Sequence, residues 1–293
     1  MGSHPTFVHL TDLHIGEPGV VDDHLYSDTS ATLSAILRDV KSLVPQPDFL
    51  IASGDLSNHG NPASYVELKR MMAEAGIDMP VLYALGNHDT RPGFYQGMLG
   101  RADDLLAPYD HDAVIAGVHI IVMDSSVPGM IGGEFTPEQF DWLQARLDEH
   151  AGLPKLLVFH HAPALDEDDI VGEWETLSCA DTIRLREVLA GRDIVGILCG
   201  HIHVDRVSHW HGIPIVVGIG QHAATDVRAL HENLRMVSAA GFALGELRPS
   251  GLTVTFVSQP ATREELNLVP LAAIAEVHRA RKEEALQKES ENA

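Results

Sequence analysis

The chain has little cysteine and little positive charge, and each shortage excludes a class of protein. Its 293 residues include only two cysteines, Cys179 and Cys199, which cannot build a disulfide framework and are typical of a reducing cytoplasm. It has 20 Lys and Arg residues but 42 Asp and Glu residues, so the formal net charge is −22. A nucleic-acid polymer needs basic surface for its phosphates, so we expect no such partner. The composition therefore predicts an acidic cytoplasmic protein.

Long apolar runs are also absent. No stretch approaches the roughly 20 apolar residues that span a bilayer, so we expect no stable membrane anchor. The N-terminus lacks a charged region followed by an apolar one, so we expect no signal peptide. Residues 1–4 could be native or a cloning remnant and carry no expectation about the fold. The apolar content of 45% is ordinary for a globular protein of this length and suffices for one large domain.

Histidine is abundant instead, with 18 residues. Six of them lie in five short motifs, and each motif follows a short apolar run rich in β-branched residues. Such a run predicts a buried strand that delivers a polar group at its C-terminal end, which is the edge where open α/β sheets bind ligands. In chain order the motifs are Asp12-x-His14, Gly54-Asp55, Gly86-Asn87-His88-Asp89, His160-His161 and Gly200-His201-x-His203.

Each motif alone has a structural explanation. Asp55 could belong to an ordinary turn, and a lone histidine at a strand end is more often structural than functional. Five motifs in one chain, all ending in Asp, Asn or His, are better explained by a metal-dependent active site. Carboxylate, amide and imidazole ligands without a thiolate suit Mn, Fe, Co or Zn better than Mg or Ca alone.

Hydrolysis of a phosphodiester would use such a ligand set. The ester is anionic, and two divalent ions about 3.5–4 Å apart both neutralise its charge and lower the pKa of a bridging water. Two such ions also reverse the local field of an acidic chain. Asp55 has two oxygens to share and is the candidate bridging ligand. The other ligands could divide between the ions, with Asp12, His14 and His203 at one and Asn87, His160 and His201 at the other.

The rest of the chain predicts one α/β domain. Helical periodicity at 29–44, 62–75, 137–150 and 181–190 alternates with the strand signals, which indicates βα units around a sheet. Thr136 and Gln139 form a predicted capping box at a helix start. After Gly200 the pattern predicts strands at 207–210, 213–217, 241–247 and 252–257. We expect a catalytic domain over 1–269 and, over 270–293, an amphipathic helical tail that frays and could contribute to a subunit interface.

The ordered series D-x-H, GD-x4-G, GNHD, HH-x-P and GHxH resembles that of the calcineurin-like metallophosphoesterase superfamily. Within it, the chain is similar to class III cyclic-nucleotide phosphodiesterases and bacterial glycerophosphodiesterases. The resemblance covers residues 7–203 in its motifs and extends to about residue 257 in architecture. It implies a four-layer α/β/β/α sandwich, two divalent metal ions (mixed Fe/Mn or Fe/Zn pairs included) and a homodimer or larger homo-oligomer.

The resemblance also implies a role for each motif residue. Asp55 matches the bridging ligand and His88 the histidine that contacts the phosphate and assists the leaving oxygen. The first metal matches Asp12, His14 and His203, and the second matches Asn87, His160 and His201, with the first histidine of the His160-His161 pair as the ligand. Outside the motifs, Asn58 and His222 are candidates for substrate binding, although His222 could instead cap a loop.

The identity of the substrate stays open. We expect a 3′,5′-cyclic nucleotide such as cAMP, hydrolysed by a metal-bridging hydroxide. A glycerophosphodiester or a phospholipid head-group diester is the alternative, and Trp174, in a predicted loop beside the cleft, could serve either. A phosphomonoesterase or a non-catalytic interaction scaffold is the remaining possibility, and the complete ligand set argues against the scaffold.

Overall fold

The computed structural model describes residues 4–229, 233–259 and 265–292. Its longer helices are α1 (Thr29–Ser42), α2 (Pro62–Glu74), α3 (Arg91–Gly97), α4 (Pro137–Asp148), α5 (Cys179–Leu189) and α6 (Leu271–Asn292), with short 3-10 turns η1 (Ile170–Glu175) and η2 (Val227–Ala229). The strands of the first two thirds of the chain are β1 (Thr6–Leu10), β2 (Phe49–Ser53), β3 (Val81–Ala84), β4 (His111–Ile115), β5 (Val118–Val122), β6 (Lys155–Val158) and β7 (Ile194–Cys199). The later strands are β8 (Arg206–Trp210), β9 (Ile213–Val217), β10 (Ala224–Thr225), β11 (Asn233–Val237), β12 (Gly241–Arg248), β13 (Gly251–Ser258) and β14 (Glu265–Pro270).

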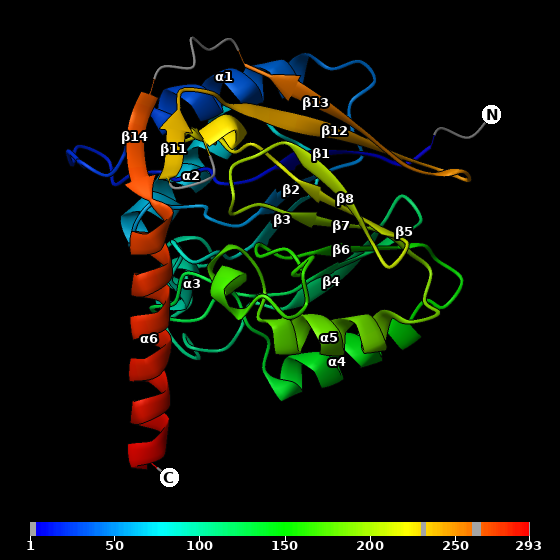
Figure 1. Ribbon diagram of the computed structural model, residues 1–293. Helices are drawn as coiled ribbons and strands as arrows, with labels where there is room; N and C mark the ends of the chain where they lie inside the picture. The colour runs from blue at the N-terminus through cyan, green and yellow to red at the C-terminus, as the bar shows by residue number, and fades with distance from the viewer. Residues whose placement is uncertain (1–3, 230–232, 260–264, 293) are drawn as a thin grey trace.

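Two large sheets and one small sheet organise these strands (Figure 1). The first has the order β13-β12-β1-β2-β3, and the second has the order β4-β5-β6-β7-β9-β8. β1, β2 and β3 run parallel, as do β5, β6, β7 and β9. The small sheet has the order β10-β11-β14 and is antiparallel.

The large sheets pack face to face and each carries helices on its outer face. Along β2, Phe49 and Ile51 point into the core between the sheets, whereas Leu50 and Ala52 point to the core under α1 and α2. The second sheet alternates in the same way, with its other face packed under α4 and α5. This alternation follows from the period-2 geometry of a strand. The predicted four-layer α/β/β/α sandwich is confirmed.

The helices α1, α2 and α4 begin at the predicted residues, and α5 begins two residues before the predicted 181. Thr136 and Gln139 form the capping box at the start of α4, and Asp28, Asn61 and Ser178 cap α1, α2 and α5 with their side chains. The four predicted strands after Gly200 correspond to β8, β9, β12 and β13. The sequence reasoning missed α3, β4, β5 and the whole small sheet.

The last helix, α6, runs from β14 along one side of the molecule (Figure 1). Its contacts within the described residues include η1, β14 and β11. His278 is buried there, and Lys282 forms an ion pair with Glu173 of η1. No helix of the described residues is both long and apolar enough to cross a membrane. The division into a catalytic domain over 1–269 and a tail over 270–293 stays a prediction.

Candidate metal centre

The predicted ligands meet at one edge of the sandwich because they all follow the C-terminal ends of parallel strands. β1 leads to Asp12 and His14, β2 to Asp55 and β3 to Asn87 on one sheet, while β6 leads to His160 and β7 to His201 and His203 on the other. His14 Nε2 lies 3.6 Å from Asp55 Oδ2 and 3.3 Å from His203 Nε2. His160 Nε2 lies 3.2 Å from Asp55 Oδ2, and His203 Nε2 lies 3.4 Å from Asp12 Oδ1. Side chains from both sheets thus converge on a single small volume.

The backbone at this edge is strained. Nine non-glycine residues of the described chain have positive φ, and five of them are predicted ligands: Asp12, His14, Asp55, His201 and His203. Such conformations are uncommon outside glycine and persist where the surrounding structure enforces them, often at active sites. The strained residues turn the chain after β1, β2 and β7, where these five predicted ligands lie.

One nitrogen of each predicted histidine ligand is held by a carbonyl oxygen. His14 Nδ1 faces Asn58 Oδ1 at 3.0 Å, and His160 Nδ1 faces the Ser53 carbonyl at 2.9 Å. His203 Nδ1 and His201 Nε2 face the carbonyls of Ala223 and Trp174, both at 2.7 Å. A carbonyl can only accept, so each facing nitrogen carries a proton and the opposite nitrogen is the one that could bind a metal. This is the arrangement by which outer groups orient a histidine for a metal.

Two buried polar atoms in the centre have no hydrogen-bond partner, Asn87 Oδ1 and His160 Nε2. A buried acceptor without a partner is costly in a folded protein, so such an atom calls for an explanation. Both belong to predicted ligands, and a bound cation would satisfy both. The donor set therefore fits a metal centre of oxygen and nitrogen ligands.

The electrostatics agree with that fit. Burial lowers the pKa of His14 well below its ordinary value and that of His201 to about 3, so both rings are neutral, which is the form that binds metal. Burial also disfavours charge on His160, but the carboxylates of Asp55 and Asp12 outweigh it and raise the pKa to about 9. A position that attracts a proton so strongly also attracts a metal cation.

Comparison with known proteins decides the family. The model of the calcineurin-like phosphoesterases matches residues 5–205. The chain belongs to the calcineurin-like phosphoesterase family. A probable cyclic nucleotide phosphodiesterase of Rhodococcus erythropolis is 36% identical over 212 residues, 72% of this chain and 68% of that protein. A cAMP/cGMP dual specificity phosphodiesterase of Mycobacterium tuberculosis is 33% identical over 215 residues, 72% of this chain and 65% of that protein.

The likeness to solved structures concerns the fold. A purple acid phosphatase from yellow lupin superimposes with a TM-score of 0.57 at 12% identity, covering 92% of this chain and 54% of that one. The predicted superfamily is therefore confirmed by both sequence and fold. Calcineurin-like phosphoesterases use a dinuclear metal centre, and the described residues include several groups of His and Asp that could hold its ions.

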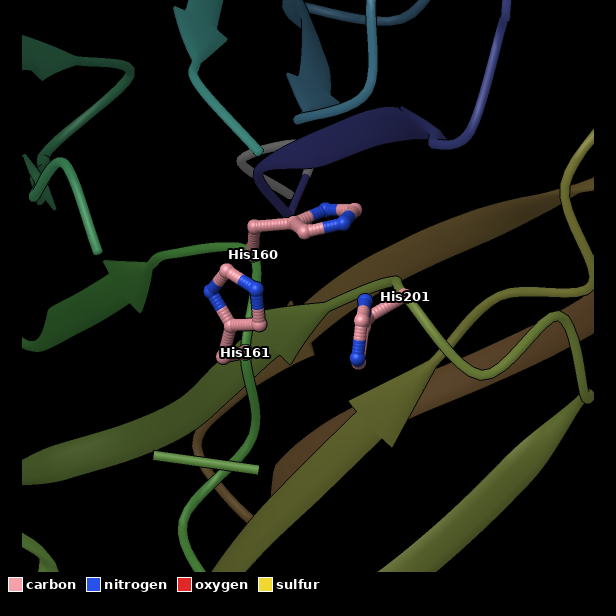
Figure 2. A group of neighbouring side chains, drawn as sticks. All are labelled: His160, His161 and His201. Carbon is pink, nitrogen blue, oxygen red and sulfur yellow. The ribbon is translucent and has the colours of Figure 1, made fainter. Parts of the chain in front are cut away.

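His161 is the neighbour that could be mistaken for a ligand of this calcineurin-like phosphoesterase. Figure 2 shows that the His160 and His161 rings leave the chain after β6 in different directions, with His201 opposite. His161 Nε2 lies 3.0 Å from the Ile131 carbonyl, and its Nδ1 lies 2.8 Å from Ser125 Oγ. The carbonyl fixes the proton on Nε2, so the Nδ1 lone pair accepts from the serine hydroxyl. His160, in contrast, has an unused nitrogen, which agrees with its choice as the ligand.

The remaining predicted residues surround the centre in different ways. The His88 ring is exposed, and its Nδ1 lies 2.9 Å from the Asn58 carbonyl, which leaves Nε2 free. Asn58 uses both ends of its amide, since Oδ1 accepts from His14 and Nδ2 donates to Asp22 at 2.7 Å. His222 Nε2 accepts from the Tyr26 backbone N–H at 2.9 Å. The substrate-binding roles of Asn58 and His222 stay predictions.

Two supporting groups escaped the sequence reasoning. Asp89, the last residue of the GNHD motif, accepts from the backbone N–H groups of Leu56, Ser57 and Gly86 and from the Tyr65 hydroxyl. It thereby ties the loop after β2 to the loop after β3. The second group is the Trp174 carbonyl that holds His201. Asp89 could have been found from the sequence, because it belongs to the GNHD motif. No sequence pattern marks a backbone carbonyl such as that of Trp174.

A cavity of about 410 Å³ opens beside the centre. Five predicted ligands line one end of it, together with His88, Asn58 and His222. Much of the remaining lining is apolar and comes from the small sheet, η1 and α6, although Glu175, Arg206 and Thr225 also line the cavity. Its volume lies within the usual range of small-molecule sites, about 300–1,000 Å³.

Proposed function

We propose that this calcineurin-like phosphoesterase is a phosphodiesterase that hydrolyses a 3′,5′-cyclic nucleotide such as cAMP with the help of two divalent metal ions. The observation that carries the proposal is the convergence of seven oxygen and nitrogen side chains from both sheets, five of which line one end of a small-molecule cavity. Relatives named as cyclic nucleotide phosphodiesterases support the choice of substrate.

The proposed ligand division follows the contacts. Asp55 lies within 4 Å of histidines on both sides, 3.6 Å from His14 and 3.2 Å from His160, which supports its proposed role as the bridging ligand. Asp12, His14 and His203 would then hold one ion, and Asn87, His160 and His201 would hold the other. When bound, the two ions neutralise the phosphoryl charge and lower the pKa of a water between them. The mixed oxygen and nitrogen set suits Mn, Fe, Co or Zn, and mixed Fe/Mn or Fe/Zn pairs are included.

His88 is the proposed general acid. Its Nδ1 proton is committed to the Asn58 carbonyl, so Nε2 is the atom that can exchange a proton with the substrate. Opening a cyclic phosphodiester leaves an alkoxide that needs a proton, and a histidine beside the reacting phosphorus supplies it. His222 and Asn58 are proposed to contact the substrate from the same cavity, which both side chains line.

A comparison of substrates tests the proposal. Purified protein reconstituted with Mn should hydrolyse cAMP with a higher kcat/KM than glycerophosphoethanolamine, and a chelated sample should hydrolyse neither. A preference for glycerophosphoethanolamine would instead assign a glycerophosphodiesterase or head-group diesterase. Turnover of p-nitrophenyl phosphate alone would assign a phosphomonoesterase. No turnover above the chelated control would overturn the catalytic proposal and leave the scaffold.

A homo-oligomer and a cytoplasmic location are part of the same proposal. The cytoplasmic location rests on the two free, buried cysteines, and the homo-oligomer on the family resemblance. Size-exclusion chromatography with light scattering measures the oligomeric state directly. A monomer over the working range of concentration would reject the homo-oligomer without affecting the catalytic proposal.

A further inference from the structure

The apolar end of the cavity has an architecture of its own. On the paired strands β11 and β14, Leu234 lies opposite Val269 and Met236 opposite Asn267. These four residues line the cavity, whereas Arg235 and Leu268, which also lie opposite each other, do not. The alternation is that of strands with one face on a binding site. Ile274 of α6 adds to the same lining, and we call Leu234, Met236, Val269 and Ile274 the apolar wall.

The apolar wall offers a ligand van der Waals contact but few hydrogen bonds. The one polar side chain on its strand face, Asn267, has both ends of its amide engaged. Its Nδ2 donates to the Tyr26 hydroxyl at 2.6 Å, and its Oδ1 accepts from the Leu268 N–H at 2.8 Å. A glycerol, choline or ethanolamine group would lose water against this surface without gaining a hydrogen bond, and a buried polar group without a partner is costly. A flat and weakly polar ring would lose much less.

From this geometry we infer that the apolar wall is the subsite for the nucleobase of a cyclic nucleotide. The inference rests on the proposed function and adds where the non-reacting part of the substrate lies. The cavity joins the wall to the metal ligands in one space of about 410 Å³, which suits a nucleotide rather than a long acyl chain. The base binds the wall while the cyclic phosphate reaches the ligands, and Trp174 of η1 also lines this cavity.

Binding of the remote base against the wall contributes to catalysis only if it helps to position the phosphate. Energy from non-reacting parts of a substrate commonly appears in kcat/KM. The wall should therefore raise kcat/KM for cAMP relative to the same ribose 3′,5′-cyclic phosphate without a base. A polar group in the wall should remove part of this advantage and leave the base-free substrate unaffected.

Two leucines, one on each strand and on opposite faces of the pair, provide the matched test. Leu234→Asn changes the wall, and Leu268→Asn makes the same change on the outward face, where Leu268 is 47% exposed. Both variants and the wild type are reconstituted with Mn and assayed with cAMP and with the base-free cyclic phosphate. We expect Leu234→Asn to lower kcat/KM for cAMP about tenfold and to leave kcat/KM for the base-free cyclic phosphate unchanged. We expect Leu268→Asn to match the wild type with both substrates.

The outcomes separate the two proposals. If wild-type protein turns over neither compound, the proposed function fails and the subsite fails with it. Suppose that the wild type is active but Leu234→Asn keeps the full preference in kcat/KM for cAMP, or loses activity equally on both substrates. The proposed function then stands and the proposed subsite is wrong. Val269→Thr, an almost isosteric polar change opposite Leu234, repeats the test should Leu234→Asn not fold.

Discussion

At the scale of single residues, the motif glycines are as constrained as the ligands. A Cβ atom built on Gly86 would lie 2.3 Å from Asp55 Oδ1 and 2.6 Å from His160 Cδ2. Both neighbours are predicted ligands held by their own hydrogen bonds, so neither can move without disturbing the centre. The glycine of the GNHD motif thus allows the loops after β2 and β3 to approach closely enough to share ions.

This contact predicts the effect of Gly86→Ala. The added methyl group should displace the Asp55 carboxylate and reduce Mn binding by about tenfold or more, as is common when ligand orientation is disturbed. Gly152→Ala is the matched control, because no atom lies within 4 Å of its Cβ position. Metal content by mass spectrometry and the melting temperature would be measured together. Full Mn occupancy in folded Gly86→Ala protein would show that Asp55 is not a shared ligand.

His88 gives a second prediction at this scale. Its ring is exposed to the cavity and its side chain belongs to none of the proposed ion sites, so His88→Ala should retain its metal. The loss of a general acid should lower kcat by on the order of 10²–10⁴-fold. His209→Ala, an exposed histidine on β8, serves as the control. Loss of metal in parallel with activity would make His88 a ligand rather than an acid.

At the scale of elements, the motif strands were predictable and the small sheet was not. The motifs follow buried strands of four to six residues, whose apolar runs and abrupt polar ends are visible in the sequence. β10 has only two residues and carries no periodic signal. In β14, period-2 reasoning would bury Leu268, yet this leucine is 47% exposed and Val269 faces the cavity. The pairing with β11, some 30 residues away in sequence, decides which face is used.

In the candidate site, likewise, one part could be predicted from the sequence and another could not. All seven predicted ligands meet because strand order alone brings the carboxyl ends together. The carbonyls that orient the histidines come from Ser53, Trp174 and Ala223, which belong to different loops. Any residue has a carbonyl, so no residue type could have marked these three positions. Their role depends on tertiary structure.

The turn η1 links one ligand to the C-terminal helix. Its Trp174 carbonyl holds His201, and its Glu173 carboxylate forms the ion pair with Lys282 of α6. Glu173 is almost fully buried, and its other oxygen accepts from the Cys179 N–H at the start of α5. Breaking the pair leaves a buried carboxylate without its partner, which is more costly than losing an exposed pair.

Lys282→Met should therefore loosen η1 and weaken Mn binding at the site of His201 by about tenfold, the lower end of the effect of outer groups on metal affinity. Glu284→Gln, which removes an exposed pair with Lys288 on the same helix, is the control and should have no effect. Calorimetric titration with Mn compares the two. Equal affinities in both variants would show that η1 keeps its position without α6.

The same ion pair has a defined pH dependence. Burial raises the pKa of Glu173, but the hydrogen bonds from Lys282 and from the Cys179 N–H together outweigh burial and hold the pKa below its ordinary value of 4.5. A depressed carboxyl pKa contributes stability above the unfolded value and loses it as the pH falls through the folded value. In chemical denaturation at a series of pH values, the contribution of Lys282 to the free energy of unfolding should thus be constant near neutral pH and decrease as the pH falls below about 4.5.

At the scale of the whole molecule, stability and activity depend on different parts of the chain. The three apolar core clusters of the described residues include none of the residues of α6. The helix instead contacts the small sheet and η1, and Ile274 lines the cavity. The boundary at residue 270 stays a prediction, and the contacts of α6 predict that the residues beyond it contribute to the site.

A chain that ends at Pro270 tests this view. Because the cores stay intact, its melting temperature should lie within a few degrees of the wild-type value, since a loss of about 1 kcal/mol moves Tm by roughly 2–4 °C at this size. Its kcat/KM for cAMP should nevertheless fall by about tenfold or more, because one side of the apolar wall and the partner of Glu173 are both removed. A chain that ends after residue 284 retains Lys282 and Ile274 and should behave as wild type. If the shorter chain were fully active, α6 would be an appendage and the catalytic unit would end with β14.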